Sequence, residues 1–267
     1  AAAPAPHRPR VILRRVLVAA CTALAVAGGR APARAQSPAA TVPWRVGEAL
    51  GYDLKFGAIK VGSGKMLVVG TDTVRDRLAW RTRFTVSGGT FFYRVHDVLE
   101  SWFDTQTLSS LRFSQDFSEG GRDREKLYEI FPDRRVFVEK GRPESPTVAE
   151  PLDDGSFLYF LRTVPLEVGK TYEFHRYFKP DRNPVVLRVL RRERIRVPAG
   201  EFACIVVQPI IKTTGIFSEN GRAEVWLSDD PRRIMVQMKS KLPFGSLNLY
   251  LRSIAGPRDS TRPPSVP

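Results

Sequence analysis

Apolar and polar side chains alternate along most of the chain from Trp44 onward. Alternation with a period of two is typical of β-strands that bury one face. Turn-forming residues separate the alternating segments, as at the hairpin predicted around Pro132 and Asp133. Many short strands at near-regular spacing predict an all-β, mainly antiparallel fold, either a sandwich or a barrel. The clearest apolar faces consist of Leu50, Tyr52, Leu54 and Phe56, of Leu78, Trp80, Phe84 and Val86, and of Val185, Leu187 and Val189.

One stretch departs from this rhythm. Residues 151–170 read PLDDGSFLYFLRTVPLEVGK, and Asp153 or Asp154 can cap a helix by accepting backbone N–H bonds. Pro165 would end that helix. We therefore expect one short helix over residues 154–163 that closes one end of the sheet. The apolar residues of the stretch recur at helical spacing, at Phe157, Leu158, Leu161 and Val164.

The beginning of the chain has the layout of a secretory signal peptide. Residues 1–35 combine a basic front, an apolar run from Val16 to Ala27, and small residues before the expected cleavage site after Ala35. The run is shorter than the about 20 residues that a membrane-spanning helix needs. The alternative is a lipoprotein box that ends at Cys21, which would leave the best apolar residues in the mature protein. We favour cleavage and expect an exported protein that is periplasmic or associated with the outer membrane.

The remaining chain reads as one domain. Residues 36–43 form a Pro/Ala/Ser linker, residues 44–254 a single β-rich domain, and residues 255–267 a Pro-rich tail that we expect to be disordered. The composition, with 42% hydrophobic and 26% charged residues, is that of an ordinary globular protein. Cys204 would be the only cysteine left after cleavage. Because it lies in the apolar run EFACIVV, we expect a buried, inert thiol.

The chain is strongly basic. The formal net charge is +14, and about +8 remains once the six arginines of the signal segment are set aside. Such a charge suits an anionic membrane surface or an acidic glycan, whereas nucleic acid is not expected for an exported protein. The plain interpretation of the densest cluster is a solvated sheet face, and the sharper hypothesis is a contact face for anionic head groups or glycans. The cluster comprises Arg188, Arg191, Arg192, Arg194 and Arg196.

Two loop-like stretches, SGGTFFYR and TTGIFSENG, are unusually apolar. Apolar residues at hairpin tips are unfavourable unless they are covered or used. They either fold back onto the core or line the mouth of a barrel. Together with the helix they give the expected ligand-binding residues: Phe91, Phe92, Tyr93, Phe157, Tyr159, Phe160, Ile216 and Phe217.

The sequence shows no clear catalytic or metal motif. The stretch KVGSGK lacks the spacing of a phosphate-binding Walker loop. Beyond the signal segment the histidines are His96 and His175, which lie in different strand patterns with no ligand cluster nearby. We therefore expect no metal, no other cofactor and no enzyme activity.

An aspartate pair near the end of the chain is the best candidate for chemistry. Asp229 and Asp230 stand between two apolar segments and precede Pro231, a setting in which aspartate commonly bonds turn backbone N–H groups. We interpret the pair as a hairpin turn. A hydrolase of envelope glycans or esters is the alternative, and it requires this pair to meet Asp153 and Asp154, because such chemistry needs carboxyls about 5 to 10 Å apart.

Four stretches in order, GEALGYDLKFGAIKVGSG, DDGSFLYFLRTVPLEVGK, VPAGEFACIVVQP and EVWLSDDPRRIMVQMKSKLPFGSLNLYL, resemble the family of domains of unknown function 3108. The resemblance covers residues 44–252. Met235 departs from it, since similar proteins often have proline there. The resemblance implies an exported bacterial protein of antiparallel β structure without an established enzyme activity, and it supplies no catalytic residues.

These inferences lead to one functional expectation. We expect a curved sheet or incomplete β-barrel with a short helix near its open side, and a concave face that binds an apolar or amphipathic ligand. A lipid, an acyl chain or an envelope glycan would fit. A structural role in an envelope assembly, through the basic face, is a third alternative, and the sequence names no protein partner.

Overall fold

The computed structural model describes residues 41–90, 93–119, 121–212, 223–242 and 245–256. The expected signal peptide, most of the linker and most of the tail therefore lie outside the described residues, as do four of the expected ligand-binding residues: Phe91, Phe92, Ile216 and Phe217. No helix among the described residues is long and apolar enough to cross a membrane.

Fourteen strands of the described chain form one antiparallel sheet. The first eight are β1 (Ala49–Phe56), β2 (Ile59–Val74), β3 (Arg77–Thr90), β4 (Tyr93–Asp104), β5 (Ser110–Glu119), β6 (Arg122–Phe131), β7 (Val136–Glu139) and β8 (Glu144–Pro146). The other six are β9 (Thr171–Phe174), β10 (Val185–Val197), β11 (Gly200–Ile210), β12 (Glu224–Ser228), β13 (Met235–Leu242) and β14 (Gly245–Ala255). The short helical segments are η1 (Pro132–Arg134), α1 (Asp154–Phe160), η2 (Leu161–Thr163) and η3 (Pro180–Arg182).

The strand order shows how the two halves of the domain join. Each strand pairs with its neighbour in sequence within β1–β8 and within β9–β14, and the pairing of β1 with β14 links the halves. The sheet ends at β8 on one side and at β9 on the other, so it is not closed into a barrel. The prediction of a mainly antiparallel, incomplete barrel is confirmed. The predicted hairpin turn at Pro132 is also confirmed, because η1 connects β6 to β7.

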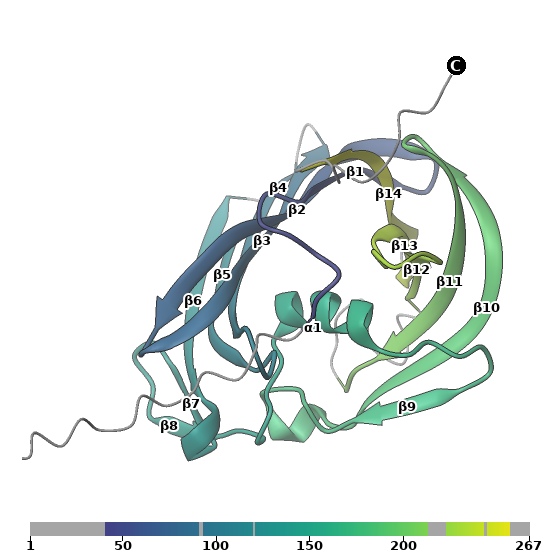
Figure 1. Ribbon diagram of the computed structural model, residues 1–267. Coiled ribbons are helices and arrows are strands. Elements are labelled where there is room, and N and C mark those ends of the chain that lie inside the picture. Colours follow the sequence, from purple (N-terminus) through teal and green to yellow (C-terminus); the bar gives the residue numbers. More distant parts are fainter. Residues whose placement is uncertain (1–40, 91–92, 120, 213–222, 243–244, 257–267) are drawn as a thin grey trace, which may run out of the picture. The chain divides into compact units, whose positions relative to one another are not determined.

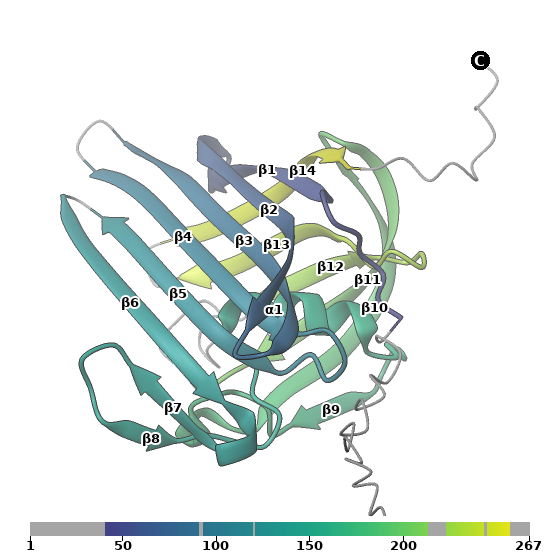
Figure 2. The same ribbon diagram turned by 60° about the vertical axis from the view of Figure 1, so that its left-hand side comes forward.

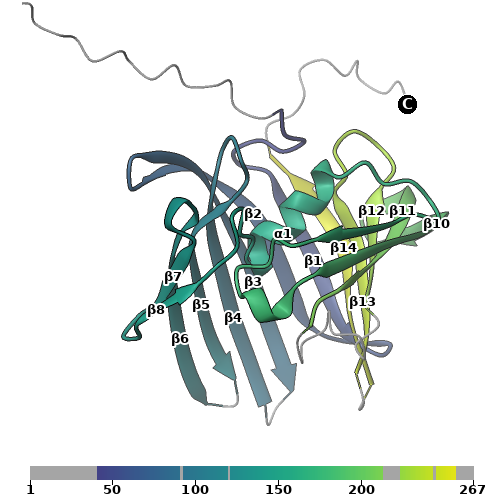
Figure 3. The same ribbon diagram turned by 90° about the horizontal axis from the view of Figure 1, so that it is seen from below.

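The helix lies inside the curve of this sheet. Figure 1 shows α1 in the hollow of the sheet, and Figure 3 shows the same helix crossing in front of the strands. It contacts β3 and β4. The predicted helix over 154–163 is confirmed by α1 and the continuing η2. Segments on either side of the helix approach each other near the open side, where Leu152 and Tyr177 form a parallel bridge.

Two aromatic groups fix the helix segment and its flanks to the sheet. Trp44 packs edge-on against Phe103 of β4 and Tyr159 of α1, with ring centroids 6.1 and 5.3 Å apart. On the other side, Phe178 packs against Phe113 and Tyr128 at 6.3 and 5.1 Å. Edge-to-face contacts of this kind add to the free energy gained from burial alone. Figure 2 shows strands β1–β6 side by side on the half of the sheet that holds Phe103, Phe113 and Tyr128.

Two glycines let β2 and β3 approach closely. Gly62 pairs with Gly88 across these strands, and a Cβ at Gly62 would lie 2.3 Å from the Ser87 carbonyl oxygen. Gly70 of the same strand β2 differs, because a Cβ there would meet nothing within 4 Å. The pair Gly62–Gly88 is thus a steric requirement of the sheet, whereas Gly70 is not.

We expect Gly62→Ala to lower the free energy of unfolding by about 1–3 kcal/mol, because overpacking against backbone forces the strands apart. Gly70→Ala is the matched control and should be neutral or stabilising by less than about 1 kcal/mol, since it only restricts the unfolded chain. Urea unfolding of both variants measures the difference. Equal effects of the two substitutions would contradict a close approach at Gly62.

Candidate functional site

The start of α1 is fixed by a buried carboxylate. Asp153 caps the helix by accepting hydrogen bonds from the backbone N–H groups of Gly155 and Ser156, at 2.8 and 2.9 Å. Ser156 returns the bond, since its Oγ accepts from the Asp153 backbone N–H at 2.9 Å. This reciprocal arrangement is a capping box, which satisfies backbone donors that a helix start leaves unpaired.

Two strand serines hold the same carboxylate. The Oγ of Ser101, from β4, donates to Oδ1 of Asp153 at 2.5 Å, and the Oγ of Ser110, from β5, donates to Oδ2 at 2.7 Å. Gly155 permits this contact, because a Cβ there would lie 2.3 Å from the Ser101 Oγ. Burial raises the pKa of Asp153 to about 6, although the hydrogen bonds from Ser101, Ser156 and Ser110 act in the opposite direction.

The carboxylate of the neighbouring Asp154 has different hydrogen-bond partners. Its carboxylate accepts from the Tyr177 hydroxyl at 2.8 Å and from Nε2 of Gln115 at 3.2 Å. Arg182 donates to the same tyrosine oxygen at 3.2 Å. Burial raises the pKa of the Asp154 carboxyl. Burial is also the largest cause of the raised pKa of the Tyr177 hydroxyl. These bonds tie the helix start to the segment that bridges the open side of the sheet.

The other end of the helix is fixed by a buried arginine. Arg162 in η2 is only 4% exposed and donates to both carboxylate oxygens of Glu48, at 2.6 and 3.0 Å. Its Nη2 also donates to the backbone carbonyls of Pro43 and Arg232, at 3.1 and 2.8 Å. The guanidinium lies 5.5 Å from the ring centroid of Trp44. One side chain therefore joins η2, the segment before β1 and the turn between β12 and β13.

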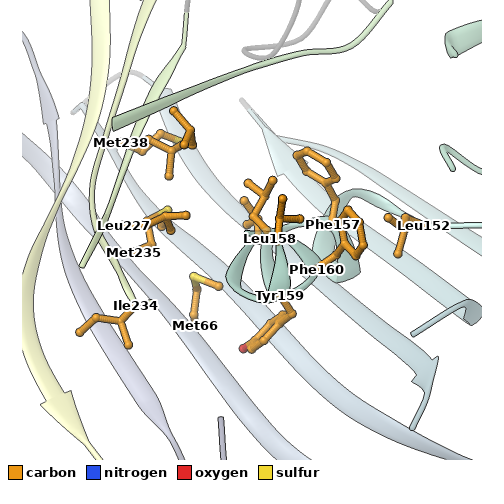
Figure 4. Close-up of a cluster of buried hydrophobic side chains, with 14 of the residues drawn as sticks. Met66, Leu152, Phe157, Leu158, Tyr159, Phe160, Leu227, Ile234, Met235 and Met238 are labelled. Atoms are coloured by element: carbon orange, nitrogen blue, oxygen red, sulfur yellow. The ribbon is translucent and has the colours of Figure 1, made fainter. Parts of the chain in front are cut away.

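An apolar interior lies between these fixed ends. Figure 4 shows Leu158 of α1 pointing toward Leu227, Met235 and Met238 on the opposite strands, with Met66 nearby. All three methionines of the chain face this interior. Leu158, Met238 and Leu227 are all buried, with exposures of 8%, 7% and 1%. The interior is thus a buried apolar core lined in part by flexible methionine side chains.

The structure describes the side chains of three predicted ligand-binding residues: Phe157, Tyr159 and Phe160. All three are on α1 and are buried, with exposures of 1%, 3% and 9%. Phe160 packs edge-on against Phe174 at 5.0 Å, and Tyr159 packs against Phe103 at 5.9 Å. They hold the helix in place, and Leu158 is the helix residue that faces the methionines. Tyr93 begins β4, but its side chain lies outside the description.

Most predicted anion-contact arginines already have carboxylate partners. Arg191 pairs with Glu224 at 2.8 Å, and Arg192 with Asp229 at 2.9 Å. Arg194 and Arg196 both approach Glu201, at 3.9 and 3.3 Å, and remain exposed. Arg188 is exposed and has no ion pair with the described carboxylates. The structure thus places these arginines along β10 as a largely charge-balanced face, and contact with an anionic surface stays a prediction.

The late aspartate pair forms the predicted turn. Asp230 accepts hydrogen bonds from the backbone N–H groups of Arg232 and Arg233 at 2.9 and 3.2 Å. Burial alone would raise the pKa of Asp230, but its hydrogen bonds and the nearby charge of Arg232 outweigh burial and lower the pKa. The turn lies at the Arg162 end of the helix segment, whereas Asp153 lies at the start. The segment from Asp153 to Arg162 is roughly 14 Å long, because a helix rises about 1.5 Å per residue. The structure does not bring the two aspartate pairs together.

The other candidate groups have structural surroundings. Cys204 is a free, buried thiol whose pKa is raised to about 12 by burial, as expected for an inert cysteine. His96 bonds through Nδ1 to the Ser87 hydroxyl at 2.8 Å. Among the described residues, no group of three His, Cys, Asp or Glu side chains could hold a metal ion.

Sequence reasoning missed the roles of Arg162 and Tyr177. Both bind partners distant in sequence, Glu48 for Arg162 and Asp154 for Tyr177. A signal was present for Arg162, since an arginine directly after a buried apolar helix needs a partner if it is buried too. No local signal identified the partner.

An open antiparallel sheet that curves around one short internal helix defines a β-barrel-like class of protein. Within that class, the chain belongs to the family described as protein of unknown function (DUF3108), whose model matches residues 51–252. The resemblance identified from the four sequence stretches is therefore confirmed.

One solved structure agrees with this chain at the level of the fold. A β-barrel-like protein of domain of unknown function DUF1849 from Brucella abortus is similar, with a TM-score of 0.52 and 10% identity, over 80% of this chain and 99% of that chain. A candidate lipoprotein from Parabacteroides distasonis ATCC 8503 has a TM-score of 0.37 and 13% identity, over 80% and 99% of the two chains. No curated protein matches the chain. At 10% identity, the similarity to the Brucella abortus protein shows the fold alone.

We expect Arg162→Met to lower the free energy of unfolding by about 3–5 kcal/mol, because it leaves Glu48 without its buried partner. Arg232→Met is the control. The side chain of Arg232 is 49% exposed and, among the described carboxylates, pairs with Asp230 alone, so its loss should cost less than about 1 kcal/mol. Guanidinium unfolding compares the variants. Similar losses would contradict the anchoring role of Arg162.

The raised pKa of Asp153 predicts a pH dependence. The folded-state pKa, about 6, lies above the value of roughly 3.9 expected for an unfolded chain. The folded state therefore holds this proton more tightly, and its contribution to stability is full below about pH 4 and is lost as pH rises through 6. The loss is on the order of 3 kcal/mol.

The measurement is the difference in unfolding free energy between the native chain and Asp153→Asn at pH 4, 5, 6 and 7. Subtracting the variant removes the titration of the other carboxyls. The native chain should lose stability relative to the variant over this range. A difference independent of pH would show that Asp153 keeps an ordinary pKa.

Proposed function

We propose that this protein is an exported, non-enzymatic envelope protein that holds the apolar part of an amphipathic ligand between α1 and the strands opposite it. The observation that carries the proposal is the interior in which Leu158 faces Met235 and Met238. Methionine is unbranched and polarizable, so it adapts to ligands of varied shape and is common at promiscuous apolar binding surfaces. An acyl chain or lipid fits this interior better than a glycan does.

The anchoring of the helix supports the same proposal. Asp153 and Arg162 fix the two ends of the α1–η2 segment through hydrogen bonds and an ion pair. The apolar middle of the segment, with Leu158, is thereby held facing the interior. Binding sites of this kind are commonly concave and apolar, with polar groups at their margins.

The proposed export and envelope location have a separate basis. They rest on the basic, apolar and small-residue order of residues 1–35, which is the layout of a secretory signal peptide. A hydrolase that combines the two aspartate pairs is not favoured, because Asp153 is enclosed by the helix cap and Asp230 by the turn. We therefore propose a binding role without catalysis.

The three native methionines provide a direct test. The protein is delipidated, labelled with ¹³C at the methionine methyl groups and titrated with laurate. We expect the signals of Met235 and Met238 to shift, because these side chains face Leu158. A dansyl-labelled acyl probe then measures affinity, and Leu158→Gln should weaken its binding about tenfold, the effect of losing roughly 1.5 kcal/mol of apolar contact.

Leu78→Gln is the control for the affinity measurement. Leu78 is 52% exposed at the start of β3, so this substitution should leave probe binding unchanged. Native mass spectrometry of protein taken from the periplasm should show a co-purified lipid. Unchanged methionine signals at saturating laurate, together with lipid-free protein, would overturn the proposal.

A further inference from the structure

A second recess lies on the opposite face of the sheet from the helix. It has a volume of about 430 Å³, within the range of small-molecule sites. Strand alternation places Trp226 and Lys239 opposite to Leu227 and Met238, which face the interior. This outer pocket is lined by side chains of β10, β12, β13 and β14: Arg191, Glu224, Trp226, Lys239, Asn248 and Tyr250, with Ser240 and Ser246 at its margin.

Trp226 forms a rigid part of this pocket. It is only 4% exposed although it lies on the outer face, and its indole N–H donates to the carboxylate of Glu193. The guanidinium of Arg191 and the ammonium of Lys239 lie 5.7 and 5.3 Å from its ring centroid. Cations at these distances are attracted to the aromatic ring. The tryptophan thereby positions two cationic groups beside the pocket.

The two cations differ in how far their charges are balanced. Arg191 forms ion pairs with Glu193 and Glu224, at 3.0 and 2.8 Å. Lys239 is exposed and forms no ion pair with any described carboxylate. The ammonium of Lys239 is therefore the lining group best able to bind an anionic group.

Asn248 offers the complementary polar group. It is 5% exposed, and its Nδ2 donates to the Ser246 hydroxyl at 3.3 Å. Its Oδ1 is buried and accepts no hydrogen bond from the described residues. A buried acceptor without a donor is unfavourable, and such a group in a native structure calls for a partner. A hydroxyl of a bound molecule would supply that donor once the amide turned its oxygen toward the pocket that Asn248 lines.

We propose that the outer pocket binds an acidic sugar, with the carboxylate on Lys239 and a hydroxyl donating to Oδ1 of Asn248. Glu224 provides a further acceptor for hydroxyl groups, and Tyr250 an aromatic wall. A free hexuronate and a uronate unit of an envelope polysaccharide share this chemistry. The site lies on the other face of the sheet from the acyl-binding interior and does not depend on that interior binding a lipid.

Isothermal titration calorimetry with D-glucuronate, D-glucose and a galacturonate trimer tests the proposal. We expect glucuronate to bind at least about tenfold more tightly than glucose, since a charged hydrogen bond on Lys239 contributes roughly that factor. Tighter binding of the trimer than of glucuronate would point to a polysaccharide, and equal or weaker binding to the free sugar.

Lys239→Gln should weaken glucuronate binding about tenfold, the loss of one charged hydrogen bond. Lys170→Gln is the matched control, since Lys170 is 58% exposed and pairs with Glu167 far from β13 in sequence. Asn248→Leu should also weaken binding. Because Lys239 is exposed, its substitution should leave folding intact, and an unchanged urea unfolding curve checks this without relying on acyl binding.

Three results would overturn the inference. They are the absence of glucuronate binding in the millimolar range, equal affinities for glucuronate and glucose, and glucuronate binding that Lys239→Gln leaves unchanged. If the native protein binds glucuronate but not the acyl probe, the proposed function is rejected and the inference about the outer pocket stands. The two outcomes are therefore separable.

Discussion

A helix as short as α1 is not stable by itself in water, and the arrangement of the domain follows from that constraint. The helix has seven residues and lies inside an open sheet, so both of its ends must be fixed by other parts of the chain. Asp153 fixes the start to β4 and β5, and Arg162 fixes the end to Glu48 and to the turn after β12. These contacts, together with the aromatic packing of Tyr159 and Phe160, keep Leu158 directed at the methionines.

Polar groups therefore anchor the helix ends in this domain, whereas apolar groups line its interior. Buried ionic groups are costly unless they are fully paired, and both anchors meet that condition through several partners each. Because Asp153 and Arg162 lie at the two ends of the α1–η2 segment, the middle of that segment carries no charged side chain. The outer face differs, because Lys239 stays exposed beside a buried tryptophan and only influences Glu193 without a direct ion pair. The same strands β12 and β13 thus present an apolar surface on one side and a polar recess on the other.

Local features could be predicted from the sequence, and long-range partners could not. Strand alternation, the helix over 154–163 and the turn at Asp230 depend on neighbours a few residues away, and the structure confirms them. The partner of Arg162 is Glu48, more than a hundred residues earlier, and no periodicity links the two. The aromatic residues of α1 were predicted as ligand contacts because they are large and apolar. The packing of Tyr159 against Phe103 and of Phe160 against Phe174 depends on a sheet topology that the pattern alone does not give.

The pairing of β1 with β14 has a consequence for how the domain folds. One edge of β1 has no partner until the residues of β14 have emerged, so the strands of the first half carry an open, hydrogen-bonding edge during synthesis. Contacts between such distant segments form slowly, because the intervening chain must first lose entropy. The edge of β1 that faces β14 therefore stays unpaired for longer than the edges between consecutive strands, and an unpaired edge favours aggregation.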